Sequence, residues 1–161
     1  MSTEATGSRR TPRYLDVGDK IWPATRRFMG LHTLLYQRTG GRLGHTIPGV
    51  PGKMLLLDHV GAKSGTKRTS PLLYVKDGEN IVIVASKGGF PKHPAWYHNL
   101  MANPDITVQV MGEHLPVHAR VATDEEYPRL WDLAVAGYGG YKDYAARSKG
   151  RKIPLVVLQP R

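Results

Sequence analysis

The stretch TSPLLYVKDGENIVIVA, residues 69–85, contains two apolar, β-branched runs on either side of Asp77-Gly78. An Asp-Gly pair between such runs is a strong hairpin signal, because glycine readily takes the left-handed backbone that a tight turn requires. We therefore predict an antiparallel hairpin formed by Thr69–Lys76 and Asn80–Ala85. Further strands are expected on both sides of it along the chain.

Four other segments have the apolar composition of strands, and two of them flank Gly112 as a second hairpin. The chain shows no strand–helix–strand alternation and no G-x-G-x-x-G or Walker sequence, which argues against a Rossmann sheet. About six strands joined by hairpins, with helices clustered elsewhere, indicate an α+β fold built on an antiparallel barrel or sheet. The additional strands are expected at Met54–Val60, Ile106–Met111, Leu115–Val121 and Ile153–Leu158.

Helices are expected between these strands. One at Pro94–Ala102 should stop before Asn103, because the residue that precedes a proline avoids the helical region. The sequence Thr-Asp-Glu-Glu at residues 123–126 has the form of a capping box and is expected to open a helix that runs to about Val135. Tyr138–Ser148 is expected to form a turn and a short helix.

The segment Lys20–Tyr36 has the apolar spacing of an amphipathic helix with a basic side. Two interpretations stay open for it: a helix packed on the core, and a helix that lies on a membrane surface with arginines such as Arg26 and Arg27 toward the lipid headgroups. Residues 1–17 are expected to be a flexible basic tail. Residues 18–161 are expected to form a single domain that contains this helix.

The composition is that of an ordinary globular protein with an unusual charge. Of 161 residues, 40% are hydrophobic and 22% charged, and 23 Lys and Arg against 13 Asp and Glu give a net charge of +10. Such an excess favours an anionic partner, which is nucleic acid, an anionic membrane or a multiply charged ligand. The chain has no cysteine, no apolar run of the roughly 20 residues that span a bilayer, and no signal-peptide pattern in Met1–Arg13, so a cytoplasmic location is expected.

Two glycine-containing loops carry cations where predicted strands end. The first is Gly-Ala-Lys-Ser-Gly-Thr-Lys-Arg at residues 61–68, and the second is Ser-Lys-Gly-Gly at residues 86–89, which a helix start follows. Glycine lets backbone N–H groups turn toward an anion, and Lys and Arg add full charges. The loops therefore predict a site for a phosphorylated, nucleotide-like cofactor, with solvated loops and ordinary turn glycines as the simpler alternative.

Three motifs follow one another in a specific order: Gly-Ala-Lys-Ser-Gly at residues 61–65, Ala-Ser-Lys-Gly-Gly at residues 85–89, and Pro-Ala-Trp-Tyr-His-Asn-Leu-Met-Ala-Asn-Pro at residues 94–104. This succession closely resembles the deazaflavin-dependent nitroreductase family. The resemblance extends to Tyr138–Tyr144 and Ile153–Val157 and covers roughly two thirds of the chain. It implies a split β-barrel related to flavin-mononucleotide-binding oxidoreductases, and coenzyme F420, a deazaflavin that carries a phosphate and an acidic polyglutamate tail.

The resemblance also implies roles for individual residues. Those of the two loops hold the phosphate and tail, strand and helix residues contact the rest of the coenzyme, and hydroxyl-bearing residues face the substrate, where Ser86 or Tyr144 is expected to hydrogen-bond the acceptor or relay a proton. The implied phosphate and tail ligands are Lys63, Arg68, Lys87, Gly88 and Gly89; the other coenzyme contacts are Pro71, Tyr74, Ala85, Ser86, Trp96 and Asn99; and the substrate-side residues are Ser86, Tyr138, Tyr141 and Tyr144.

Structural roles stay open for the same aromatic residues. Trp96 and Tyr97 can be core aromatics of a short helix that also back a cofactor wall, and the three tyrosines can cover an end of the barrel. No metal site is expected, because the seven histidines do not form a metal-binding pattern.

The reaction implied is hydride transfer from reduced coenzyme F420 to an electron-poor acceptor such as a quinone or a nitroaromatic compound. The alternatives are an FMN-dependent oxidoreductase, a non-catalytic flavin- or haem-related binder of the same fold, and a nucleic-acid-binding protein. Nucleic acid is not expected, because the cations are spread over the chain rather than interleaved with aromatic residues. Since quinones reside in lipid, the expected location extends to a peripheral position at the inner face of the membrane.

Overall fold

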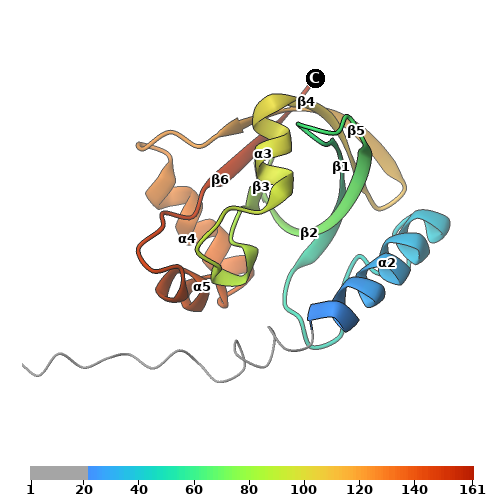
Figure 1. Cartoon of the computed structure of the whole chain (residues 1–161), viewed down its shortest axis with the longest axis horizontal. Coiled ribbons are helices and arrows are strands. Elements are labelled where there is room, and N and C mark those ends of the chain that lie inside the picture. Colours follow the sequence, from blue (N-terminus) through green and yellow to red (C-terminus); the bar gives the residue numbers. More distant parts are fainter. Residues whose placement is uncertain (1–21) are drawn as a thin grey trace, which may run out of the picture.

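The centre of the molecule is a closed barrel of six antiparallel strands, in a computed structural model that describes residues 22–161 (Figure 1). Around the barrel the strands follow the order β1-β2-β3-β6-β5-β4. The predicted α+β class and antiparallel barrel are confirmed. The strands are β1 (Lys53–Val60), β2 (Lys67–Asp77), β3 (Asn80–Val84), β4 (Asp105–Val110), β5 (Glu113–Val121) and β6 (Leu155–Pro160).

The two predicted hairpins join neighbouring strands of this barrel. β2 and β3 pair antiparallel on either side of a turn in which Gly78 has a φ of 60°. β4 and β5 are joined by Met111 and Gly112, and Met111 itself takes the left-handed backbone with a φ of 55°. Both hairpins are therefore confirmed.

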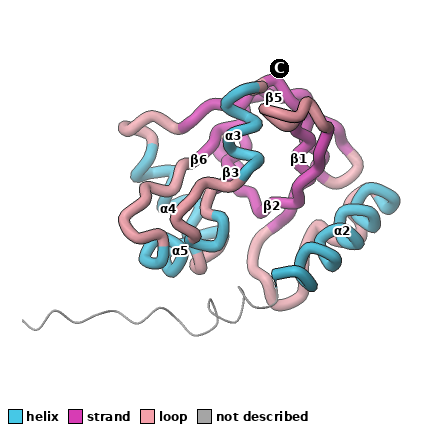
Figure 2. Tube along the Cα trace, in the orientation of Figure 1, coloured by secondary structure: helices cyan, strands magenta, loops and turns pink. Residues whose placement is uncertain are grey.

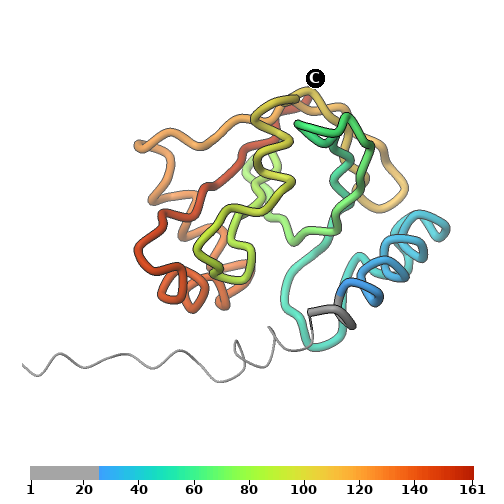
Figure 3. Tube along the Cα trace, viewed as in Figure 1, coloured from blue at the N-terminus to red at the C-terminus, as the bar shows by residue number. Residues whose placement is uncertain are grey.

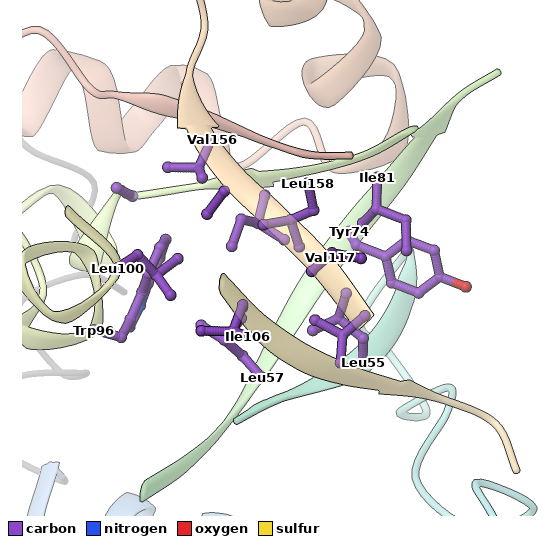
Figure 4. Close-up of a cluster of buried hydrophobic side chains, with 14 residues drawn as sticks. Leu55, Leu57, Tyr74, Ile81, Trp96, Leu100, Ile106, Val117, Val156 and Leu158 are labelled. Atoms are coloured by element: carbon purple, nitrogen blue, oxygen red, sulfur yellow. The ribbon is translucent and has the colours of Figure 1, made fainter. Parts of the chain in front are cut away.

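The interior of the barrel is filled by alternate residues of its strands, as the period of two along a strand requires. Side chains from all six strands belong to this buried cluster. α3 (Ala95–Ala102) closes one end, and Figure 4 shows its Trp96 and Leu100 on one side of the cluster with Tyr74 on the opposite side. Because full burial of a large apolar side chain contributes about 1.5–3 kcal/mol, this cluster is a main source of the stability of the fold.

A second apolar layer lies outside the barrel. α4 (Tyr127–Gly137) packs against β2, β3 and β6, and α5 (Tyr141–Arg147) follows it in the chain. Figure 2 shows both helices on the same side of the molecule, away from α2. Leu130 and Ala134 of α4 are fully buried in a cluster with outward-facing residues of the barrel. The barrel is thus apolar on part of its outer face as well as inside.

The predicted capping box forms immediately before α4. The Thr123 N–H donates to a carboxylate oxygen of Glu126 at 2.9 Å, and the Glu126 N–H donates to the Thr123 hydroxyl at 3.2 Å. Arg120 binds the same carboxylate through both terminal nitrogens at 2.8 Å. These bonds close a turn, and the helix itself begins later than predicted, at Tyr127.

α2 (Trp22–Thr39) lies beside the barrel, on the side of β2 (Figure 1). Its anchor is the fully buried Tyr36, whose hydroxyl donates to the Met54 carbonyl at 3.0 Å and accepts the Met111 N–H at 2.8 Å. The helix packs on the barrel through the buried His32 and Tyr36, whereas most of its large apolar side chains stay exposed, so the interpretation that it packs on the core holds for one face only. The exposed side chains are Phe28, Leu31, Leu34 and Leu35.

The helix predicted from Lys20 is described from Trp22 onward, and it continues beyond the predicted end to Thr39. None of the helices within residues 22–161 has the length and apolar character needed to cross a membrane. The predicted basic tail, residues 1–17, lies outside the described residues.

Candidate functional site

An open stretch of strand edge interrupts one side of the barrel. β2 pairs with β1 over residues 67–74, but its ladder with β3 covers only residues 74–77. On the side of β3, residues 67–73 therefore present backbone groups that no strand in the described part of the chain pairs. Pro71, which has no N–H to lose, lies in this segment. We call residues 67–73 the open edge of β2; it is the place in the barrel wall where a ligand can bind strand backbone.

The first loop, residues 61–66, leads from β1 to this open edge. A hydrogen bond from the Gly61 N–H to the Thr66 carbonyl, 2.9 Å, closes its base. The side chain of Lys63 is exposed. No acceptor within residues 22–161 binds the N–H of Lys63 or of Ser64. The loop thus offers two free N–H groups beside an ammonium group, which is the chemistry of an anion site.

The second loop is the turn η1 (Lys87–Gly89), which follows β3. All three residues are left-handed, with φ of 47° at Lys87, 61° at Gly88 and 80° at Gly89. For Lys87 this conformation costs about 1–2 kcal/mol, so the surroundings must hold it. A Cβ at Gly89 would lie 2.6 Å from the Tyr144 carbonyl oxygen. The turn is therefore packed directly on α5, while the side chain of Lys87 stays exposed.

The guanidinium of Arg151 binds the backbone carbonyls on either side of η1. Its Nη2 donates to the Ser86 carbonyl at 2.9 Å, its Nη1 to the Ala85 carbonyl at 3.2 Å, and its Nε and Nη2 to the Phe90 carbonyl at 3.1 and 2.9 Å. Burial lowers the pKa of Arg151 below its ordinary value. Since the C=O and N–H of a peptide unit point in opposite directions, the N–H groups that follow the Ala85 and Ser86 carbonyls point away from the guanidinium. The clamp thus leaves these N–H groups available to an anion on the other side.

Three tyrosines after α4 form a packed cluster. The rings of Tyr138 and Tyr141 meet edge to face at 5.0 Å, and the hydroxyl oxygens of Tyr138 and Tyr144 lie 3.1 Å apart. Burial, with Tyr138 nearby, raises the pKa of Tyr141, while Tyr138 and Tyr144 are half-buried. Gly140 permits the arrangement, because a Cβ there would lie 2.6 Å from the Tyr138 ring. Tyr141 is therefore the buried member of the cluster, and Tyr138 and Tyr144 keep part of their surface exposed.

A crevice separates this tyrosine cluster from the outer face of the barrel. Leu73, the last residue of the open edge, is also part of its wall, so the open edge continues into the crevice. The tyrosines therefore lie along the side of the barrel and do not cover its end. The crevice is narrow, with room for about one water molecule, and its lining is largely apolar. It includes Leu73 and Val75 of β2, Val82 and Val84 of β3, Tyr138 and Tyr141.

The two loops lie at opposite ends of α3 (Figure 3). η1 precedes its N-terminus, and the first loop is bound near its C-terminal end by a 2.9 Å hydrogen bond from the Ala62 N–H to Asn99 Oδ1. The helix therefore lies between the two loops. No Asp or Glu occurs in residues 61–76 or 85–104. The arrangement therefore suits an elongated anion with several charges.

Not all residues expected at the site converge on the open edge. Pro71 faces outward there, whereas Tyr74 has the opposite phase on β2 and points into the barrel. Trp96 is 8% exposed and belongs to the barrel core, and both ends of the Asn99 amide are bound within the protein. The structure thus brings the two loops, Pro71 and the tyrosine cluster around the open edge. It leaves Tyr74, Trp96 and Asn99 in supporting positions.

Sequence reasoning missed two residues that shape the loops, Arg151 and His59. The partners of Arg151 are carbonyls distant in sequence, together with His93 Nδ1 at 2.7 Å, and their convergence follows only from the fold. His59 carried a usable signal, because it is polar at an inward position of β1, in phase with Leu55 and Leu57. A buried polar side chain needs hydrogen-bond partners, so its position alone indicates a network.

Residues 28–160 match the family model described as F420H(2)-dependent quinone reductase. An F420H(2)-dependent quinone reductase of Mycobacterium tuberculosis strain H37Rv is 44% identical to this chain over 138 residues, which are 84% of this chain and 91% of that relative. The match includes the barrel, both loops and the tyrosine cluster.

Solved structures agree with this assignment. An F420-H2 dependent reductase (FDR-A) is 42% identical with a TM-score of 0.61, covering 66% of this chain and 93% of its own. A second structure, described as a domain-swapped dimer, is 37% identical with a TM-score of 0.64 and covers 88% of this chain and 98% of its own. HutZ, the haem storage protein of Vibrio cholerae, is 17% identical with a TM-score of 0.52 over 67% of this chain and 81% of its own, and shares the fold alone. The chain belongs to the F420H(2)-dependent quinone reductase family.

Proposed function

We propose that this protein binds the reduced deazaflavin coenzyme F420 along the open edge of β2 and uses it to reduce a quinone. The observation that supports this most directly is the open edge itself. Two cationic loops lie near it, one at either end of α3, and the edge continues into an apolar crevice that is lined by tyrosines. The bound reduced coenzyme supplies a hydride, which with one proton converts a quinone into a quinol. Binding, orientation and exclusion of water are then the work of the protein.

The two loops fit the acidic end of the coenzyme. Lys63 and Arg68 at one end of α3 and Lys87 at the other are exposed, and hydrogen bonds to charged groups contribute about 1.5–3 kcal/mol each. Flavin mononucleotide has a single phosphate and needs only one such loop. Two cationic loops, one at either end of α3, favour the longer acidic tail of F420.

The hydroxyls near the crevice are the proposed contacts of the acceptor. Tyr138 and Tyr144 share a hydrogen bond, so either can hold the shared proton while the other donates to a carbonyl oxygen of the acceptor. Tyr141, with its raised pKa, stays neutral and supports both rings by packing. Ser86 is the other proposed donor, because it lies between the end of β3 and η1, directly before Lys87.

The test is turnover by purified protein with reduced F420 and a water-soluble quinone, followed through the absorbance of the oxidised deazaflavin. Tyr144→Phe should lower kcat by about 100-fold, the lower end of general acid catalysis, with little change in coenzyme affinity. Lys87→Ala should instead weaken coenzyme binding. Lys76→Ala, an exposed cation beyond the open edge, is the control and should change neither. Absence of turnover by the wild type with any quinone would contradict the proposal.

We also propose that α2 rests on an anionic membrane surface, where a quinone resides. At about 100° per residue, its four exposed apolar side chains fall within a sector of about 120°. Arg27 and Arg38 belong to the same sector and are exposed. Long basic side chains can reach lipid headgroups while the apolar ones enter the acyl region. A second copy docked on this face would bring like charges together, which favours the membrane over a helix-to-helix dimer.

Flotation with vesicles tests this contact. At low salt the protein should co-migrate with vesicles of anionic phosphatidylglycerol and much less with vesicles of neutral phosphatidylcholine. Leu31→Glu should abolish flotation, while Leu43→Glu, at an equally exposed leucine outside α2, should not. Absence of flotation by the wild type, or a dimer that dissociates with Leu31→Glu in sedimentation, would contradict it.

A further inference from the structure

A buried polar network ties the first loop to β1, β2 and α3. His59 is 5% exposed and Asn99 7%. Asn99 Oδ1 accepts the Ala62 N–H at 2.9 Å, and Asn99 Nδ2 lies 2.9 Å from His59 Nδ1. His59 Nε2 lies 2.9 Å from the Ser70 hydroxyl oxygen. The network thus runs from the open edge of β2, through the barrel end, to the loop proposed to bind the anionic end of the coenzyme.

The protonation state of His59 follows from its partners. A backbone N–H can only donate, so the Ala62 N–H fixes the oxygen of the Asn99 amide toward the loop. The amide nitrogen then faces His59 and donates to Nδ1, which must be unprotonated. The proton of the neutral ring is therefore on Nε2 and is donated to Ser70. The network is complete only with a neutral imidazole.

A second proton on His59 is incompatible with this network. Protonated Nδ1 would face the Asn99 NH2 group, donor against donor. Rotation of the amide by half a turn would repair that contact and set the NH2 against the Ala62 N–H instead. In either arrangement one hydrogen bond of the loop or of the amide is lost in a buried place, where an unsatisfied polar group is costly.

We propose that His59 is a positioning residue for coenzyme binding: as a neutral ring it fixes, through Asn99, the Ala62 N–H and with it the anion-binding shape of the first loop, and its protonation releases the loop. The inference rests on the proposed function, since the anion is the phosphate or tail of F420. Ala62 directly precedes Lys63 and Ser64, whose N–H groups are free for that anion.

The surroundings of His59 hold the ring neutral. Burial first, then the charge of Arg68 on β2, lower the pKa of His59 below its ordinary value, while Asp58 on β1 raises it. The carboxylate of Asp58 also accepts the Thr69 hydroxyl at 2.6 Å. The neighbouring residues on the other elements carry no charge: α3 contributes Asn99, and on β4 Thr107 pairs with Asp58 of β1. Protonation is therefore confined to acidic conditions.

The experiment measures the affinity of the intact protein for oxidised F420, by fluorescence titration from about pH 7.5 to about pH 5. His59→Asn places an acceptor close to the position of Nδ1 but cannot titrate. His59→Leu has similar bulk and no acceptor. His114→Asn, at an exposed histidine of β5, is the control for loss of a histidine. Amide hydrogen exchange at Ala62 in the absence of coenzyme is the second readout.

At neutral pH we expect His59→Leu to bind F420 about tenfold more weakly, the effect of one lost hydrogen bond, and His59→Asn to stay close to the wild type. On acidification the wild type and His114→Asn should lose affinity, and His59→Asn should lose distinctly less. The exchange of the Ala62 N–H should be faster in His59→Leu than in the wild type.

The inference is overturned if His59→Leu binds as tightly as the wild type, or if His59→Asn keeps the full pH dependence. It is also overturned if the wild type gains affinity on acidification relative to His59→Asn, because His59 would then act as a simple cation. If the wild type does not bind F420 at any pH, the proposed function fails. The Ala62 exchange rate then decides the network alone: unchanged exchange in His59→Leu overturns it, and faster exchange supports it.

Discussion

Arg151 provides the hydrogen-bond donors for the backbone carbonyls around the η1 turn, as a neighbouring strand would do in a regular sheet. Its guanidinium satisfies the carbonyls of Ala85, Ser86 and Phe90 at once, which a planar group with five N–H donors can do and an ammonium cannot. The guanidinium places its charge against these carbonyls, and the side chain of Lys87 adds a second, exposed charge to the turn. A single residue thus sets both the shape and the potential of the second loop.

Arg151→Lys should therefore damage the turn although the charge is kept. We expect the free energy of unfolding to fall by about 2 kcal/mol, from the loss of hydrogen bonds to a charged group, and the affinity for F420 to fall several-fold. Denaturant unfolding and fluorescence titration measure the two effects. Arg42→Lys, at an exposed arginine, is the control. Equal effects of both substitutions would show that the clamp is not needed.

Substitutions at the two glycines of η1 would distinguish the cost of a strained backbone from the cost of a steric clash. At Gly88, φ is 61° and a Cβ would have no neighbour closer than 4.0 Å, whereas at Gly89, φ is 80° and a Cβ would lie 2.6 Å from the Tyr144 carbonyl oxygen. Gly88→Ala should cost only the left-handed backbone, about 1 kcal/mol. Gly89→Ala should cost more in thermal unfolding and should also weaken coenzyme binding. Similar losses for both would mean that η1 does not need its close contact with α5.

At the scale of elements, α4 depends on the turn that precedes it. Hydrogen bonds from Arg120, then from the Thr123 backbone, lower the pKa of Glu126 from 4.5 to about 2. A carboxyl whose pKa is lower in the folded protein contributes its stabilisation fully above its unfolded value and loses it as the pH falls through the folded value. The contribution of Glu126 should therefore disappear between about pH 4.5 and pH 2.

In Glu126→Gln, the free energy of unfolding should accordingly decrease less on acidification than it does in the wild type. Denaturant unfolding between about pH 7 and pH 3 should show a smaller loss of stability in this variant than in the wild type. Glu125→Gln is the control, because its carboxyl is exposed and lies next in the chain. A wild-type acid limb in Glu126→Gln would mean that the turn does not depend on the ionised carboxylate.

α2 depends on Tyr36 in the same way. Without its hydroxyl, the Met54 carbonyl and the Met111 N–H lose their partner in a buried place, so Tyr36→Phe should cost about 1–3 kcal/mol. The loss should concentrate in α2, as faster hydrogen exchange there than in the barrel. Tyr97→Phe, at a half-buried tyrosine, should leave the exchange of α2 unchanged. Uniform acceleration across the barrel would contradict a local anchor.

At the scale of the whole molecule, local signals predicted the strands and the two hairpins. Asp77-Gly78 and Gly112 determine turns through residues adjacent in sequence, and alternation determines which side chains point inward. The fate of α2 did not follow, because an amphipathic pattern shows that a helix has an apolar face and not what covers it. The two cationic loops of the site could also be predicted from sequence, because glycine next to a cation is a pattern of residues adjacent in the chain.

The open edge and the clamp could not be predicted in this way. Pro71 within a strand indicates an edge, but only the β2–β3 ladder shows how far the edge extends. Arg151 lies far in sequence from the carbonyls that it binds, and Tyr74 and Trp96 resemble site residues in sequence although their side chains belong to the barrel core. Long-range contacts of this kind depend on the completed fold.

The central claim, that two cationic loops across α3 hold the acidic end of F420, is tested most directly by titrating the protein with intact F420 and with the deazaflavin fragment that lacks phosphate and tail. The account predicts that intact F420 binds at least about 100-fold more tightly, since at least two charged hydrogen bonds are added. Lys63→Ala and Lys87→Ala should each reduce that ratio. Equal affinity for the two compounds, or a ratio unchanged in both variants, would contradict the claim.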